Sequence, residues 1–257
     1  MSYIIIGEII IFRKGKRMDK RNIRGLLIVF LSFIINLIGG IINMFVSGNT
    51  AGTIVSAIVV IVSLGVSIYG LSQLTGFSEH FRKARAITYI YLGAELATLI
   101  GSSIISSNVA ASTASFNIGG YVGSYYALVA YTIIFAAVNA ALNIFYITEI
   151  LSGCMDIARD NNAPLEFSRI FLLRRWYAIS LTITVACQIL ILLITVSAIS
   201  GAFASYITYG TATNPVASGF LVFFSIIEII AGIIYIVSYI RVLMTIYKTY
   251  NSNKSIN

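Results

Sequence analysis

Long apolar segments alternate with short polar stretches along most of the chain. Crossing ~30 Å of hydrocarbon takes roughly 20 helical residues, because each residue adds ~1.5 Å along the helix axis. The segments that reach this length cover residues 25–46, 53–74, 86–106, 121–147, 176–198 and 217–239. The pattern therefore predicts an all-α integral membrane protein with six transmembrane helices.

Similar short motifs end the second, fourth and sixth of these segments. They read IYGLSQL (68–74), IFYITEI (144–150) and IYIVSYI (234–240), and each has an aromatic residue at its second position, namely Tyr69, Phe145 and Tyr235. Related motifs, LIGGII (37–42) and LIGSSII (99–105), occur in the first and third segments. The similarity predicts three tandem helical hairpins, although apolar segments of such limited composition also resemble one another by chance.

Composition and charge support a membrane location and predict an orientation. Hydrophobic residues make up 58% of the chain and charged residues only 10%, which is outside the usual range of soluble domains. Of the 17 lysines and arginines, seven precede the first segment, three follow the second, four follow the fourth and three follow the last. The connections at 47–52, 107–120 and 199–216 carry no charge. Positive residues stay on the cytoplasmic side, so both termini are predicted to be cytoplasmic, in the cell membrane.

The net charge of +8 therefore indicates contact with anionic lipid headgroups at the cytoplasmic face rather than with nucleic acid. The chain divides into a basic N-terminal segment (1–22), a transmembrane domain (23–247) and a short cytoplasmic tail (248–257). The apolar run 4–12 is too short to span a bilayer and precedes the positive cluster, which excludes a secretion signal. Two interpretations remain open: translation starts at Met18, or residues 1–17 form a helix on the membrane surface.

The longest cytoplasmic connection leads into the fifth segment. Helix-start residues at 161–164 precede Phe167, Ile170 and Phe171, which lie on one face of a helix. We expect an interfacial helix at about 162–175, followed by Trp176 and Tyr177 in the aromatic belt of the membrane. A simple anchor at the membrane surface is favoured over a docking site for a cytoplasmic partner.

Two of the predicted spans carry a carboxylate on a polar stripe. Residues spaced alternately by three and four lie on one helix face. This spacing aligns Thr88, Tyr91, Glu95, Thr98 and Ser102 in the third span, and Ser225, Glu228, Gly232, Tyr235 and Tyr239 in the sixth. The first, fourth and fifth spans contribute Asn36, Asn139 and Gln188 to weaker polar faces.

The depth of the two carboxylates is similar. Glu95 follows Ala86 by a helical rise of roughly 14 Å, and Glu228 follows Ala217 by roughly 17 Å, so both are predicted near the midplane of the bilayer. Asn36 and Gln188 lie at a similar depth by the same measure. A polar layer is therefore expected across the centre of the bundle.

A carboxylate at this depth is expected to have a structural or functional role, because a charge there costs ~2.5–3.5 kcal/mol on insertion scales. No lysine, arginine or histidine lies inside the spans at this level, so we expect both carboxyls to be mainly protonated when dry. They either hold helices together through hydrogen bonds or bind a proton, a metal cation or an amine during transport. The predicted binding residues are Glu95, Glu228, Asn36, Gln188, Asn139 and Tyr91.

Other chemistry is mostly excluded by composition. His80 is the single histidine and lies in a cytoplasmic segment, so neither a two-histidine metal site nor a histidine-dependent intramembrane hydrolase can form. We predict no catalytic residues, no metal site and no cofactor. Cys154 and Cys187 lie at different depths and are expected to stay reduced. Small residues on one face of the fourth span are predicted to pack against another helix: Gly123, Ala127, Ala130, Ala137 and Ala141.

The sequence thus predicts a multi-pass membrane protein, not an enzyme, that moves a small solute or cation. It acts alone, as a homo-oligomer or as the membrane subunit of a larger transporter. The alternative is a non-transporting scaffold or accessory subunit whose polar helix faces only pack the bundle.

Overall fold

The computed structural model describes residues 20–46, 50–115, 118–161, 164–209 and 215–254. Within them the chain forms six helices and no strand: α1 (Lys20–Val46), α2 (Thr50–Leu74), α3 (Glu79–Ala114), α4 (Ile118–Asp160), α5 (Pro164–Tyr209) and α6 (Pro215–Lys254). The prediction of an all-α fold is confirmed for these residues. The two interpretations of residues 1–17, including a start at Met18, concern residues outside the described ranges.

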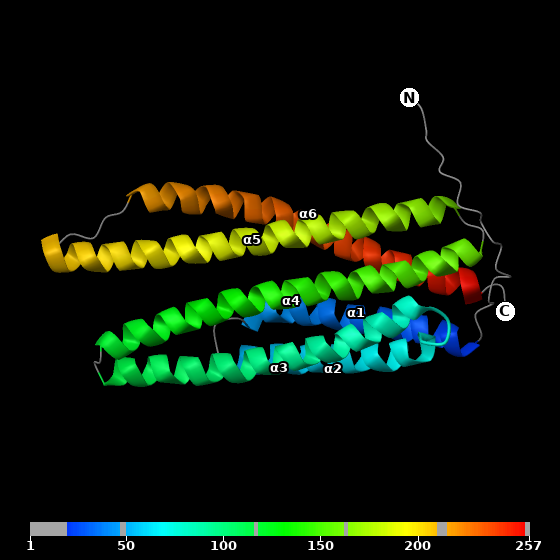
Figure 1. Cartoon of the computed structure of the whole chain (residues 1–257), viewed down its shortest axis with the longest axis horizontal. Coiled ribbons are helices and arrows are strands. Elements are labelled where there is room, and N and C mark those ends of the chain that lie inside the picture. The colour runs from blue at the N-terminus through cyan, green and yellow to red at the C-terminus, as the bar shows by residue number, and fades with distance from the viewer. Residues whose placement is uncertain (1–19, 47–49, 116–117, 162–163, 210–214, 255–257) are drawn as a thin grey trace, which may run out of the picture.

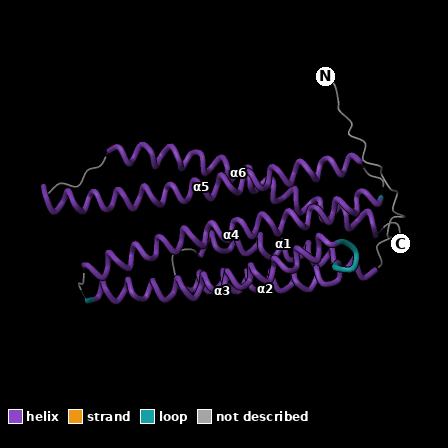
Figure 2. The backbone as a smooth tube through the Cα atoms, viewed as in Figure 1, coloured by secondary structure: helices purple, strands orange, loops and turns teal. Residues whose placement is uncertain are grey.

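Consecutive helices run in opposite directions and form three hairpins, α1–α2, α3–α4 and α5–α6, which hold the most extensive helix contacts (Figure 1). One end of the bundle, here named the charged end, holds the start of α1, the α2–α3 turn, the end of α4, the start of α5 and the end of α6. All described charged residues except Glu95 and Glu228 lie toward this end. The opposite, uncharged end holds the end of α3, the start of α4, the end of α5 and the start of α6, and there the α3–α4 and α5–α6 hairpins lie apart (Figures 1 and 2).

Five of the helices are long and apolar enough to cross a membrane, and the described apolar part of α2, Ile58–Leu74, is shorter. Such helices indicate a polytopic membrane protein. Several extend beyond the apolar segments from which they were predicted, since α3 continues to Ala114 and α5 to Tyr209. Hydropathy locates the part of a helix that fits the bilayer, whereas the helix itself continues until a residue such as proline or glycine ends it.

The first turns of α5 occupy the position of the expected interfacial helix. α5 begins at Pro164, a favourable first helical residue, and continues without a break to Tyr209. Residues 162–163 lie outside the described ranges. Trp176 is half exposed, but Tyr177, expected beside it in the aromatic belt, is buried inside the bundle. Adjacent residues on a helix point about 100° apart, and here Trp176 points outward while Tyr177 points into the bundle.

The densest packing lies at the charged end. The completely buried side chains there include Leu74 of α2, Phe81 of α3, Ile150 and Leu151 of α4 and Ile246 of α6. The ring of Phe81 on α3 lies over Gly153 of α4, where a Cβ atom would meet ring carbons at 2.5 Å. Gly153 therefore provides the space that lets α3 and α4 come together.

A second close approach joins α1 and α2. A Cβ atom on Gly70 would lie 2.9 Å from the backbone nitrogen of Val29 and 3.0 Å from the carbonyl oxygen of Gly25. Both neighbours are backbone atoms, which cannot rotate away. The two glycines therefore allow contact between helix backbones, the arrangement that small residues provide in membrane helices.

The small-residue face of α4 is a correction to the sequence prediction. Its described members Gly123, Ala127, Ala130, Ala137 and Ala141 are exposed rather than packed against another helix of the chain. The helices α3 and α5 instead contact α4 through other faces. Small residues permit close contact but do not select which neighbour supplies it.

Candidate functional site

A small cavity lined by both polar and apolar side chains lies between the helices. Its volume is about 20 Å³, enough for one water molecule, which needs ~10–15 Å³. Five helices line it, through Ser32, Phe33 and Asn36 (α1), Ser63 and Leu64 (α2), Tyr91 (α3), Asn143, Tyr146 and Ile147 (α4) and Tyr239 (α6). Two of the predicted binding residues, Asn36 and Tyr91, therefore meet at one site.

Tyr91 connects this cavity to Glu95. Its hydroxyl interacts with the Glu95 carboxyl one helix turn further along α3 and with the side chain of Asn143 on α4. Glu95 itself is half-buried. The polar stripe predicted on the third span thus faces α4, and its carboxylate lies one turn beyond the cavity.

Asn143 extends the polar contacts to α5 and α6. Its Oδ1 accepts a hydrogen bond of 2.7 Å from the Tyr177 hydroxyl, which lies 3.5 Å from the hydroxyl of Tyr235. One series of polar groups thus runs from Glu95 through Tyr91, Asn143 and Tyr177 to Tyr235. It joins all helices of the α3–α4 and α5–α6 hairpins.

Serine and tyrosine hydroxyls complete the wall of the cavity. Tyr239 on α6 donates to the carbonyl oxygen of Phe33 at 3.0 Å, and its side chain also interacts with that of Asn36. Ser63 donates to the carbonyl oxygen of Ser32 at 2.9 Å, and Ser67 is hydrogen-bonded to Tyr146. These bonds satisfy polar groups across α1, α2, α4 and α6.

Asn139 lies on α4 one helix turn from Asn143, towards the uncharged end. Its Oδ1 is buried and has no hydrogen-bond partner among the residues that the structure describes. A buried acceptor without a donor is costly, by roughly 1–3 kcal/mol, and usually marks a water, an ion or a functional contact. This atom is the clearest unsatisfied polar group of the predicted site.

Glu228 and Gln188 lie apart from the cavity. Glu228 is half-buried on α6, close enough to Cys187 of α5 for the two side chains to interact electrostatically. Between α3 and α6 no described Cα atoms approach within 8 Å, so the two carboxylates occupy separate helix pairs. Gln188 on α5 is exposed. The structure therefore joins Glu95, Tyr91 and Asn36 but leaves Glu228 and Gln188 outside this group.

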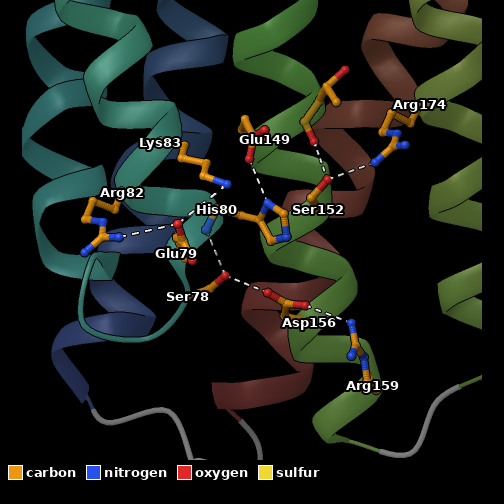
Figure 3. Close-up of polar contacts among 11 residues, drawn as sticks. Ser78, Glu79, His80, Arg82, Lys83, Glu149, Ser152, Asp156, Arg159 and Arg174 are labelled. Carbon is orange, nitrogen blue, oxygen red and sulfur yellow. Dashed lines mark hydrogen bonds and ion pairs between the residues drawn. The ribbon is translucent and has the colours of Figure 1, made fainter. Parts of the chain in front are cut away.

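A separate polar network holds the charged end together, as Figure 3 shows. The Ser78 hydroxyl donates to Asp156 of α4 at 2.6 Å and accepts the backbone N–H of His80 at 3.2 Å, which caps the start of α3. Arg159 contacts the other oxygen of Asp156 at 3.1 Å, and His80 Nδ1 lies 2.7 Å from Glu149. Arg174 of α5 donates to Ser152 at 3.1 Å.

The described residues contain no group of three or more histidine, cysteine, aspartate or glutamate side chains that could hold a metal ion. Cys154 and Cys187 are both free and buried. These side chains lie on different helices, in keeping with the reduced state expected from the sequence.

Five residues of the cavity and its polar contacts are not among the predicted binding residues: Tyr146, Tyr177, Tyr235, Tyr239 and Asn143. Tyr235 and Tyr239 lie on the polar stripe predicted for the sixth span, but their neighbours cannot be predicted, because helix spacing shows which residues share a face and not which helix that face contacts. Tyr146 and Tyr177 sit among apolar residues and near span ends, where tyrosine ordinarily faces the lipid headgroups.

A comparison of the chain with protein families, curated proteins and solved structures finds no match. Its function is therefore inferred from its own residues.

Proposed function

We propose that this protein moves a small solute or cation across the cell membrane, alone or as the membrane subunit of a transporter. In this proposal the six helices span the bilayer with both termini in the cytoplasm, and the charged end contacts anionic headgroups. The orientation is supported by the gathering of lysine and arginine at one end of the bundle.

The observation that carries the proposal is the polar cavity connected to Glu95 through Tyr91. Glu95 lies ~14 Å from the start of its apolar segment, near the midplane of a ~30 Å core. Ionisable groups at such a depth face a bundle interior or a water-filled cavity and mark ion or substrate pathways. A carboxylate beside tyrosine and asparagine side chains suits a proton, a small monovalent cation or an amine.

A second candidate function, a scaffold or accessory subunit, is favoured by the small size of the cavity and by its internal hydrogen bonds. Ser63 of α2 and Tyr239 of α6 both donate to backbone carbonyl oxygens of α1. Such bonds hold helices together without any ligand. They account for the hydroxyl groups but leave the Asn139 oxygen and the placement of Glu95 unexplained.

Flux measurements in reconstituted vesicles distinguish the two functions. We expect vesicles containing the protein to pass protons together with a monovalent cation or methylamine, and Glu95→Gln to lower this flux by at least tenfold without changing the folded yield. Glu79→Gln is the matched control, because it removes a carboxylate from the exposed first turn of α3. Flux that is the same for wild type, Glu95→Gln and empty vesicles with every solute would favour the scaffold.

A further inference from the structure

The antiparallel pairing of α3 and α4 places Glu95 level with Asn139. Phe81 lies against Gly153, and ten residues further along α3 Tyr91 interacts with Asn143, ten residues earlier in α4. Continuing this register by one helix turn brings Glu95 opposite Asn139. Further on, Gly101 contacts Tyr131, so the pairing continues on both sides of this level.

The side chains near the level of Glu95 and Asn139 provide hydroxyl groups but no positive charge. Tyr91 of α3 contacts Glu95, while Asn143 and Tyr146 of α4 and Tyr235 of α6 lie near Tyr91. The described part of α2, which also packs on α3, contributes Tyr69 as its titratable side chain, and that residue is exposed. No lysine, arginine or histidine lies on α2, or on α3 and α4 at this depth. The Asn139 oxygen therefore has no cationic donor nearby.

A metal ion fits this level poorly. Calcium takes six to eight oxygen ligands and magnesium an octahedron of six, whereas Glu95, Asn139 and Tyr91 supply only a few oxygens beside a cavity of about 20 Å³. A protonated carboxyl, by contrast, has one O–H group to donate, which is what an unpaired amide oxygen lacks.

We propose that Glu95 is the proton-binding site of the protein and that its neutral carboxyl donates a hydrogen bond to Oδ1 of Asn139. The proposal rests on the proposed function and names the proton as its coupling ion. Release of the proton to water leaves a carboxylate that the Tyr91 hydroxyl stabilises, while the Asn139 oxygen loses its donor. The two protonation states thus use different partners on α3 and α4.

Infrared titration of the carboxyl C=O stretch in the full-length protein in lipid vesicles tests this proposal without any flux assay. We expect wild type to show a protonated carboxyl at neutral pH, Glu95→Gln to lose it, and the matched deep-carboxyl control Glu228→Gln to retain it. Asn139→Leu removes the acceptor, so the band should move to the higher frequency of a free carboxyl. Asn139→Ala, which adds no bulk, should give the same shift if Asn139→Leu does not fold.

A spectrum in which Glu95→Gln removes no protonated carboxyl, or in which neither Asn139 variant moves the band, would overturn the proposal. The outcome is separable from that of the proposed function. If the Glu95 band depends on Asn139 but the protein shows no flux, the proton site is supported and the transport function is rejected. If flux depends on Glu95 but the infrared spectrum shows no such band, the transport function is supported and the proton site is rejected.

Discussion

The two ends of the bundle differ in how their apolar side chains are covered. At the charged end, Phe81, Leu151 and Ile246 are completely buried, and the polar network of Figure 3 surrounds them. Towards the uncharged end, Ile100, Ile134 and Ile229 are each about 60% exposed. Water drives apolar side chains together, whereas lipid tails are as apolar as the side chains themselves. In the proposed transmembrane arrangement, the covered parts of the helices meet water and the exposed apolar parts meet lipid.

Helix length agrees with this division. α4 has 43 residues and α5 has 46, which corresponds to roughly 65 and 69 Å, more than the ~40–45 Å of a complete bilayer. The residues in excess include the charged parts of these helices near Asp156 and Arg169. A packed core at the charged end therefore stabilises helices that extend out of the hydrocarbon.

The largest effect is expected from removing a buried ring at the charged end. Phe81→Ala should destabilise the protein by about 3–5 kcal/mol, because it leaves a cavity over Gly153. Ile100→Ala, in the exposed part of the same helix, should change stability by about 0.5 kcal/mol or less. Reversible unfolding in mixed micelles measures both, and similar values for the two variants would remove the distinction between the ends.

An intermediate effect is expected at the contact between α1 and α2. Gly70→Ala should cost about 1–3 kcal/mol, since its Cβ would meet backbone atoms of α1 that cannot move aside. Gly65→Ala is the matched control on the same helix, because nothing lies within 4 Å of its added Cβ. Alanine is the better helix former, so this control should be neutral or stabilising by up to ~1 kcal/mol. The same unfolding assay checks the pair, and equal losses at both glycines would contradict the close contact.

A smaller effect is expected from the network that caps α3. Ser78→Ala should cost about 1 kcal/mol, the usual value for loss of a helix cap. Asp156→Asn should lower the free energy of unfolding by part of the same amount, because Ser78 donates to Asp156. A double-mutant cycle of the two variants should give a coupling of about 1 kcal/mol. Glu79→Gln, which breaks only exposed pairs with Arg82 and Lys83, should cost roughly 0.2–0.5 kcal/mol. Strictly additive losses at Ser78 and Asp156 would show that the hydrogen bond contributes nothing.

The helices could be predicted from the sequence because hydropathy and length depend on local composition. The shared face of Tyr91 and Glu95 also follows from spacing alone. Their partner does not, since nothing in the spacing of Asn139 and Asn143 specifies α3 as the neighbouring helix. The similar depth of Glu95 and Glu228 predicts a shared layer, yet the structure places them on α3 and α6, between which no described Cα atoms approach within 8 Å.

The predicted repeat shows the same limitation. Its aromatic positions Tyr69 and Phe145 are exposed, whereas Tyr235 lies within the tyrosine cluster beside Tyr177. Similar motifs thus occur in three helices, α2, α4 and α6, whose surroundings differ. A helix sequence determines which faces are apolar, and the positions of the other hairpins determine which of those faces become buried.

The unbroken course of α5 has a mechanical consequence. The helix is held near Ile170 and Leu173 in the packed core, and its far end extends beyond Val196 towards the uncharged end. A rigid rod anchored at one end amplifies small rotations: a tilt of about 5° over roughly 50 Å of helix moves the far end by ~4 Å. A repacking of one side chain at the charged end would therefore appear at the uncharged end as a displacement of ~4 Å, most of one helix turn.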